Sequence, residues 1–246
     1  MAVFDWFDQS SAKVRNTRIS KEVLKTVKKS LVPVASWLLV VITWSLACSV
    51  QASVTPSSVV AELFSTVKQM KKEEPDKNVL LTPADVKRNT ELGQRVDRLL
   101  DIEGISAYAL WEHWNSRGAQ DRKSFVHTFT EVLEKVAYVN TSKFLKDLEV
   151  SVNKEKVLSD KAMVYTSIVH EKEGRVDIDF KLRQAGDAWV VEDVLLDGVS
   201  LARNLRTQCQ KIIRENSFHE LLARMRKKIT EVDKEDLKDV TGRDFN

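Results

Sequence analysis

The stretch that decides the fold is Arg175-Val176-Asp177-Ile178-Asp179-Phe180-Lys181-Leu182-Arg183-Gln184. Its apolar side chains alternate with charged ones, so a strand here buries one face and leaves the other in water. Turn signals flank it, with Gly174 before and Gly186 after. Together with the neighbouring β-branched runs, it predicts an antiparallel meander of about four strands, over residues 148–153 (the weakest), 161–170, 175–184 and 188–196.

Apolar residues at helical spacing predict helices on both sides of these strands. The predicted helices cover residues 57–70, 82–100, 104–114 and 121–138 before the strands, and 199–215 and 217–229 after them. Thr82-Pro83-Ala84-Asp85 is typical of a helix start, because it offers a cap, a proline at the first position and an acid in the first turn. Helices, then strands, then helices predict an α+β fold.

An apolar leader precedes this domain. No charged side chain lies between Lys29 and Glu62, and residues 31–50 are almost wholly apolar. Basic residues before this segment, and small residues at 50 and 52, favour a secretory signal peptide that is cut after Ala52. The segment is also about long enough to span ~30 Å of hydrocarbon, so an uncleaved anchor remains open, and lipidation at Cys48 is a third reading.

Charge and length define the remaining boundaries. Residues 1–52 hold seven Lys/Arg and three acids, which leaves 32 basic and 33 acidic residues in the rest of the chain. That near balance argues against nucleic-acid binding. Residues 231–246 carry too few apolar side chains to pack, so we expect one domain over 53–230 and a mobile charged tail after it. Cleavage after Ala52 leaves a single thiol, Cys209, which we expect to be buried.

The sequence holds no recognisable catalytic or metal-binding motif. GxSxG, P-loop, GxGxxG, HExxH and CxxC patterns are all absent, and no histidine has a second ligand-type residue at metal-site spacing. Tyr108, Trp111 and Trp114 form an aromatic run on one short helix. Either they pack in an ordinary core, or they form a wall of an apolar cavity.

The segment from Trp189 to Arg206 (WVVEDVLLDGVSLARNLR) closely resembles the signature of the MlaC family, the toluene-tolerance or periplasmic phospholipid-binding carrier proteins. In that family a tryptophan is followed by Asp-Val, an Asp/Glu-Gly-Val-Ser-Leu run and Asn-Tyr-Arg. The resemblance covers roughly residues 99–229. This chain departs from it at Trp111, Leu205 and Ser217, where the family usually has glycine, tyrosine and glycine.

The resemblance implies helices packed on a curved antiparallel sheet, similar to the NTF2-like arrangement, around a deep apolar cavity for acyl chains. It implies phospholipid as cargo, no cofactor and no catalysis, and a monomer in the periplasm. Its partners would be an outer-membrane lipoprotein complex and an inner-membrane ABC transporter with an MCE-domain protein. The expected lining residues are Val176, Ile178, Phe180, Leu182 and Trp189 from the sheet, and Tyr108, Trp111, Phe129, Leu133 and Tyr138 from the helices.

Matching motif positions are expected to hold the corner between the last strand and the next helix. Asp197 or Ser200 would cap the helix, Gly198 would take a backbone shape closed to other residues, and Arg206 would reach a carboxylate. Two other classes remain open. One is an anchored interaction module that keeps its apolar segment, and the other is a small enzyme that uses His170 or Asp177.

Overall fold

The computed structural model describes residues 54–72, 80–170 and 174–241. The predicted signal peptide, residues 1–52, lies outside these described residues. Within them no helix combines the length and the apolar character needed to cross a bilayer.

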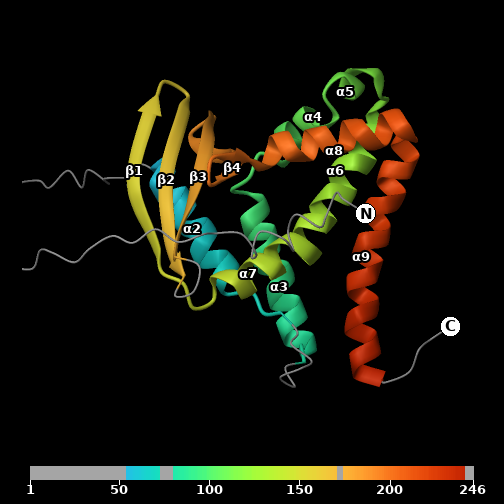
Figure 1. Ribbon diagram of the computed structural model, residues 1–246, viewed down its shortest axis with the longest axis horizontal. Helices are drawn as coiled ribbons and strands as arrows, with labels where there is room; N and C mark the ends of the chain where they lie inside the picture. The colour runs from blue at the N-terminus through green and yellow to red at the C-terminus, as the bar shows by residue number, and fades with distance from the viewer. Residues whose placement is uncertain (1–53, 73–79, 171–173, 242–246) are drawn as a thin grey trace, which may run out of the picture. The chain divides into compact units, whose positions relative to one another are not determined.

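One antiparallel sheet, with the strands in chain order, forms one side of the domain (Figure 1). Its strands are β1 (Val150–Leu158), β2 (Lys161–His170), β3 (Gly174–Ala185), β4 (Ala188–Leu196) and the short β5 (Val199–Ser200). The predicted meander is therefore confirmed. β1 is longer than the weak strand expected near 148–153, and β5 adds a fifth strand.

The two faces of β3 differ as the alternation predicts. Val176, Ile178, Phe180 and Leu182 are buried, whereas the charged residues between them are half-buried. In the register, Phe180 lies opposite Val164 of β2 and Val194 of β4. β1, at the edge of the sheet, is exposed along almost its whole length.

Two helices that begin with threonine caps precede the sheet. In α2 (Pro56–Lys68) and α3 (Pro83–Asp97), the cap is Thr55 and Thr82 respectively, each in a reciprocal capping box with a proline directly after it. The start predicted at Thr82-Pro83 is confirmed. α2 lies against the sheet, with Phe64 at the interface (Figure 1).

The predicted helix over 104–114 is interrupted. α4 (Ile102–Leu110) ends at Trp111, whose φ is +49°, and a short α5 (Glu112–Ser116) follows. A positive φ with ψ of −120° cannot continue an α-helix. The apolar spacing continues across Trp111, so it predicted one unbroken helix and gave no sign of the break.

The predicted helix over 121–138 is longer than expected and changes its winding. α6 (Ala119–Val132) passes without a break into a π-helical turn, η2 (Leu133–Tyr138), and then into α7 (Val139–Leu145). Such π-helical turns are rare and often lie at functional sites.

Two long helices follow the sheet. α8 (Leu201–Glu215) agrees with the predicted stretch, except that residues 199–200 form β5. α9 runs from Phe218 to Thr241, so the end expected after residue 229 is wrong, and residues 231–241 of the expected tail are helical. Glu, Lys and Leu, which favour helices, recur in the sequence of this segment.

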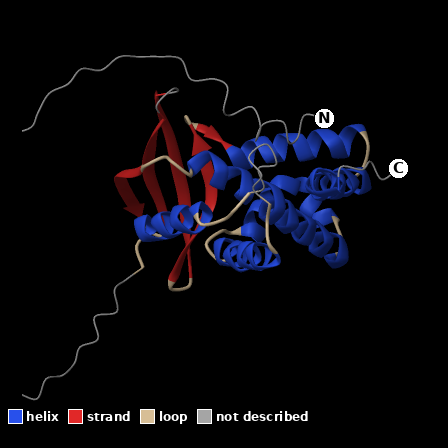
Figure 2. Ribbon diagram, turned by 90° about the horizontal axis from the view of Figure 1, so that it is seen from below, coloured by secondary structure: helices blue, strands red, loops and turns tan. Residues whose placement is uncertain are grey.

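Apolar side chains form two clusters. The sheet cluster joins the inner face of the sheet to α2, α3, η2 and α7, and the helical cluster joins α4, α6, α8 and α9. Leu133, the first residue of η2, packs against both. Figure 2 shows the strands on one side of the domain, with a helix across them, and most of the helices on the other side.

Candidate functional site

Most of the predicted lining residues lie in the sheet cluster. Val176, Ile178, Phe180 and Leu182 are at most 7% exposed. The Phe180 ring meets the Phe64 ring of α2 edge to face, with 5.3 Å between ring centroids. The sheet–helix interface is therefore filled by the protein's own side chains.

Two further predicted residues border the same cluster. Tyr138, at the end of η2, is buried, and its hydroxyl donates a 2.7 Å hydrogen bond to Asp97 Oδ1 on α3. Trp189 of β4 is partly buried and packs against the cluster from the sheet side. Tyr138 and Trp189 thus add to the apolar surface of the sheet cluster, and the Tyr138 hydroxyl also links η2 to α3 by a hydrogen bond.

Phe129 lies in the helical cluster instead. Its ring stacks on Phe125, with 6.1 Å between centroids. Leu133, one helical turn after Phe129 and the first residue of η2, contacts both clusters. The structure thus divides the predicted lining between two apolar cores that meet at η2.

Tyr108 and Trp111 lie at the surface, 36% and 50% exposed. Their rings are edge to face at 6.3 Å, and the Arg206 guanidinium sits 3.5 Å from the Trp111 centroid and 5.3 Å from that of Tyr108. We expected Arg206 to reach a carboxylate. Instead it stacks on the two aromatic rings.

An acidic pair that the sequence analysis missed lies beside Tyr138. Asp97 on α3 and Glu134 on η2 share a hydrogen bond. Burial, and then the neighbouring Asp97 carboxyl, raise the pKa of Glu134 to about 7. Burial also raises the pKa of Asp97, although the hydrogen bond from Tyr138 opposes that rise. The only sign of this pair in the sequence was an acidic residue, Glu134, beside the apolar residues of the same helix.

The family-like segment builds the corner between β4 and α8. Ser200 Oγ accepts from Arg203 N at 3.0 Å and caps α8, as expected. Asp193 supports it, accepting from Ser200 Oγ at 2.8 Å and from Ala202 N at 3.1 Å. Gly198 has φ of +79°, the backbone shape predicted for it. These side chains hold the corner together.

Two pockets open on the described surface. One, of about 620 Å³, is lined by Glu103, Trp114, Ala119, Arg122, Lys123, Val126 and His127. The other, of about 350 Å³, is lined by Asp101, Gly104, Tyr108, Lys181, Glu192, Asp193, Ser200, Ala202 and Arg203. Of the predicted lining residues only Tyr108 borders either of them. Both linings are rich in charge, so neither suits acyl chains.

Asp177 is one of the two residues considered for catalysis, and it faces water. Asp177 lies on the outer face of β3, with its side chain 50% exposed and 2.8 Å from Arg175 Nε. In the described part of the chain, no three His, Cys, Asp or Glu side chains gather as metal ligands would. Cys209 is buried as expected, and burial raises the pKa of its thiol to about 12.

A family model and a solved structure match this chain. The family model described as "MlaC protein" matches residues 57–227. No curated protein matches the chain. Among solved structures, a phospholipid-binding protein from Ralstonia solanacearum, in complex with a phospholipid, is similar with a TM-score of 0.57 and 14% identity. The match covers 72% of this chain and 96% of that one, and it shows a shared fold.

Proposed function

This chain belongs to the MlaC family, and from that membership we propose that it is a periplasmic phospholipid shuttle. It would carry phospholipid between the outer and inner membranes and so help to maintain the lipid asymmetry of the outer membrane. An outer-membrane lipoprotein complex and an inner-membrane ABC transporter with an MCE-domain protein would be its partners. The carrier itself would make and break no covalent bond.

The observation that supports this proposal most is the apolar interface between sheet and helices. Two acyl chains with some thirty methylenes represent roughly 24 kcal/mol of transfer free energy at ~0.8 kcal/mol per CH₂. A surface groove cannot supply that burial. The inner face of β3 and the facing helices offer a continuous apolar surface without a charged side chain among its core residues.

Acyl chains would enter this interface only if its side chains move apart. Phe64 and Phe180 are in contact in the structure, so a bound chain would separate α2 from β3 at this pair. Leu133 and η2, which touch both apolar clusters, would form the far wall. The headgroup would remain in water at the mouth, because burying its charge is costly.

Native mass spectrometry of the protein recovered from the periplasm, with lipid extraction, tests the proposal. We expect a mass that begins at Ser53 and one stoichiometric phospholipid. A folded protein without phospholipid would contradict the carrier function. A lipid-free protein that still holds residues 31–50 would instead support an anchored interaction module.

A matched pair of variants tests the location of the lipid. Ala162 is 4% exposed on the inner face of β2, so Ala162→Phe fills space in the interface. Val169 is 67% exposed on the same strand, so Val169→Phe adds bulk outside it. We expect Ala162→Phe to lower the lipid-bound fraction severalfold and Val169→Phe to leave it unchanged. Far-UV circular dichroism and cooperative unfolding must show both variants folded. Equal lipid loading in the two would place the lipid elsewhere.

A further inference from the structure

Trp111 has an unusual backbone and an exposed side chain. Its φ of +49° and ψ of −120° lie where residues with a Cβ are strained. Its ring is nevertheless half in water. The strained backbone of Trp111 does not bury its side chain. This combination indicates a role for the indole ring at the surface.

The neighbouring contacts hold this ring in place. Arg206 covers one side of it at 3.5 Å, and Tyr108 meets its edge. Gln210 Nε2 donates to Leu110 O at 2.8 Å and to Ala109 O at 3.3 Å, which ties α8 to the end of α4. The aromatic pair is thus mounted on two helices that are fixed to each other.

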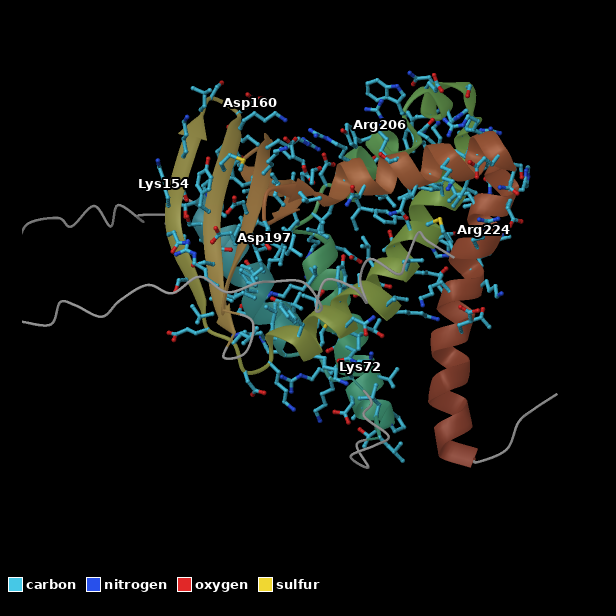
Figure 3. The ribbon with its side chains drawn as sticks, viewed as in Figure 1. Lys72, Lys154, Asp160, Asp197, Arg206 and Arg224 are labelled. Carbon is cyan, nitrogen blue, oxygen red and sulfur yellow. The ribbon has the colours of Figure 1, made fainter. Side chains whose placement is uncertain are left out.

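α8 presents a row of cations beside the aromatic pair. Arg203, Lys211 and Arg214 are exposed on the side of α8 away from the buried Cys209, and Arg206, half-buried beside Trp111, flanks that side; we call these four residues the basic face of α8. Over its length of roughly 16 Å, no carboxylate of the described residues forms a salt bridge with any of the four. Arg206 is labelled in Figure 3, on the side of the domain opposite Lys154 of β1.

We propose that the basic face of α8, together with Trp111 and Tyr108, docks the protein on the surface of an anionic phospholipid bilayer. Arginine and lysine attract anionic headgroups, and arginine pairs well with phosphate. Tryptophan and tyrosine prefer the headgroup level, where one part of the ring is apolar and the other wet. Of the four cations only Arg203 borders the pocket of about 350 Å³. A row of cations that extends along α8 beyond this pocket fits a sheet of headgroups better than a folded acidic partner.

This inference goes beyond the shuttle function. A carrier that meets only protein partners needs no bilayer-docking face, so the shuttle could stand if this proposal fails. Membrane docking would in turn raise the local concentration of the carrier where its lipid is exchanged.

Vesicle flotation tests the docking. The protein recovered from the periplasm is mixed at low salt with phosphatidylcholine vesicles, or with vesicles that contain 30% phosphatidylglycerol. We expect flotation only with the anionic vesicles, and its loss when salt is raised, because screening weakens exposed charges. Equal flotation with both vesicle types, or none with either, would overturn the proposal.

Variants assign the binding to this face. At about fivefold per cation, Arg203→Gln with Arg206→Gln should weaken the apparent partitioning roughly 25-fold. Trp111→Gly should weaken it severalfold while relieving the backbone, since glycine accepts a positive φ. The charge-matched control, Lys154→Gln with Lys156→Gln on exposed β1, should leave it unchanged. An equal loss in the control, or no loss in the α8 pair when thermal melts show every variant folded, would disprove this surface.

Discussion

The Tyr138 hydroxyl donates a 2.7 Å hydrogen bond to Asp97 Oδ1, and through it the π-helical turn η2 is joined to the end of α3. Glu134, one helical turn earlier, shares a hydrogen bond with the same Asp97 carboxyl. The π-helical turn η2, whose Leu133 packs against both apolar clusters, is thus joined to α3 by ionisable side chains.

Tyr138→Phe should destabilise the protein by about 1 kcal/mol at neutral pH, because it removes a hydrogen bond to a carboxylate that can partly recover by taking up a proton. The tyrosine hydroxyl keeps the pKa of Asp97 lower than burial alone would. Its loss should therefore cost more at pH 8 than at pH 4. Urea unfolding at both pH values measures this. Tyr165→Phe, which changes a half-buried residue of β2, is the control. An equal loss of stability in that variant would contradict the role of Asp97.

Glu134→Gln should flatten the pH dependence of stability. An acid whose pKa is higher in the folded protein binds its proton more tightly there, so folding is favoured at low pH and weakened as pH rises. For Glu134 the window runs from about 4.5 to about 7. Because the carboxyl is only half-buried, solvent screening reduces the effect to about 1 kcal/mol. Unfolding free energies across this window test it, with Glu91→Gln on exposed α3 as control. A wild type whose stability is constant from pH 4.5 to 7 would contradict the raised pKa.

Gly104→Ala should destabilise the protein by about 2 kcal/mol. An added Cβ would lie 2.1 Å from Asp101 Oδ2, the oxygen that also accepts from Arg183 Nε at 2.5 Å. The Cβ would force this partly buried ion pair and the cap of α4 to move. Gly118→Ala, with nothing within 4 Å of the new atom, should cost less than about 1 kcal/mol. Thermal melts compare the two, and equal costs would show that Asp101 yields freely.

Cys209 should not react with a thiol reagent such as DTNB in the folded protein. Its side chain is 1% exposed, and burial raises the pKa of the thiol to about 12. Labelling at pH 8 should therefore follow global unfolding in urea. Rapid stoichiometric labelling in buffer would show that α8 opens locally.

Sequence reasoning succeeds where the cause is local. The alternation in β3 and the threonine–proline start of α3 follow from neighbouring residues, so both were predictable. The break at Trp111 was not, because the apolar spacing runs on through it and the Arg206 that contacts its ring lies far along the chain. The pairing of Asp97 with Glu134 was missed for the same reason, since only the packing of α3 on η2 brings the two together.

The exposed strand β1 has a consequence for aggregation. Among the described residues it pairs only with β2, so its other edge is where a strand of another copy could add. Lys154, Glu155 and Lys156 fill the middle of that strand, and its register with β2 shifts between Val152 and Lys154. Charges and an irregular edge are the means by which natural sheets discourage further pairing. The exposed edge strand thus protects the protein from polymerising through its sheet.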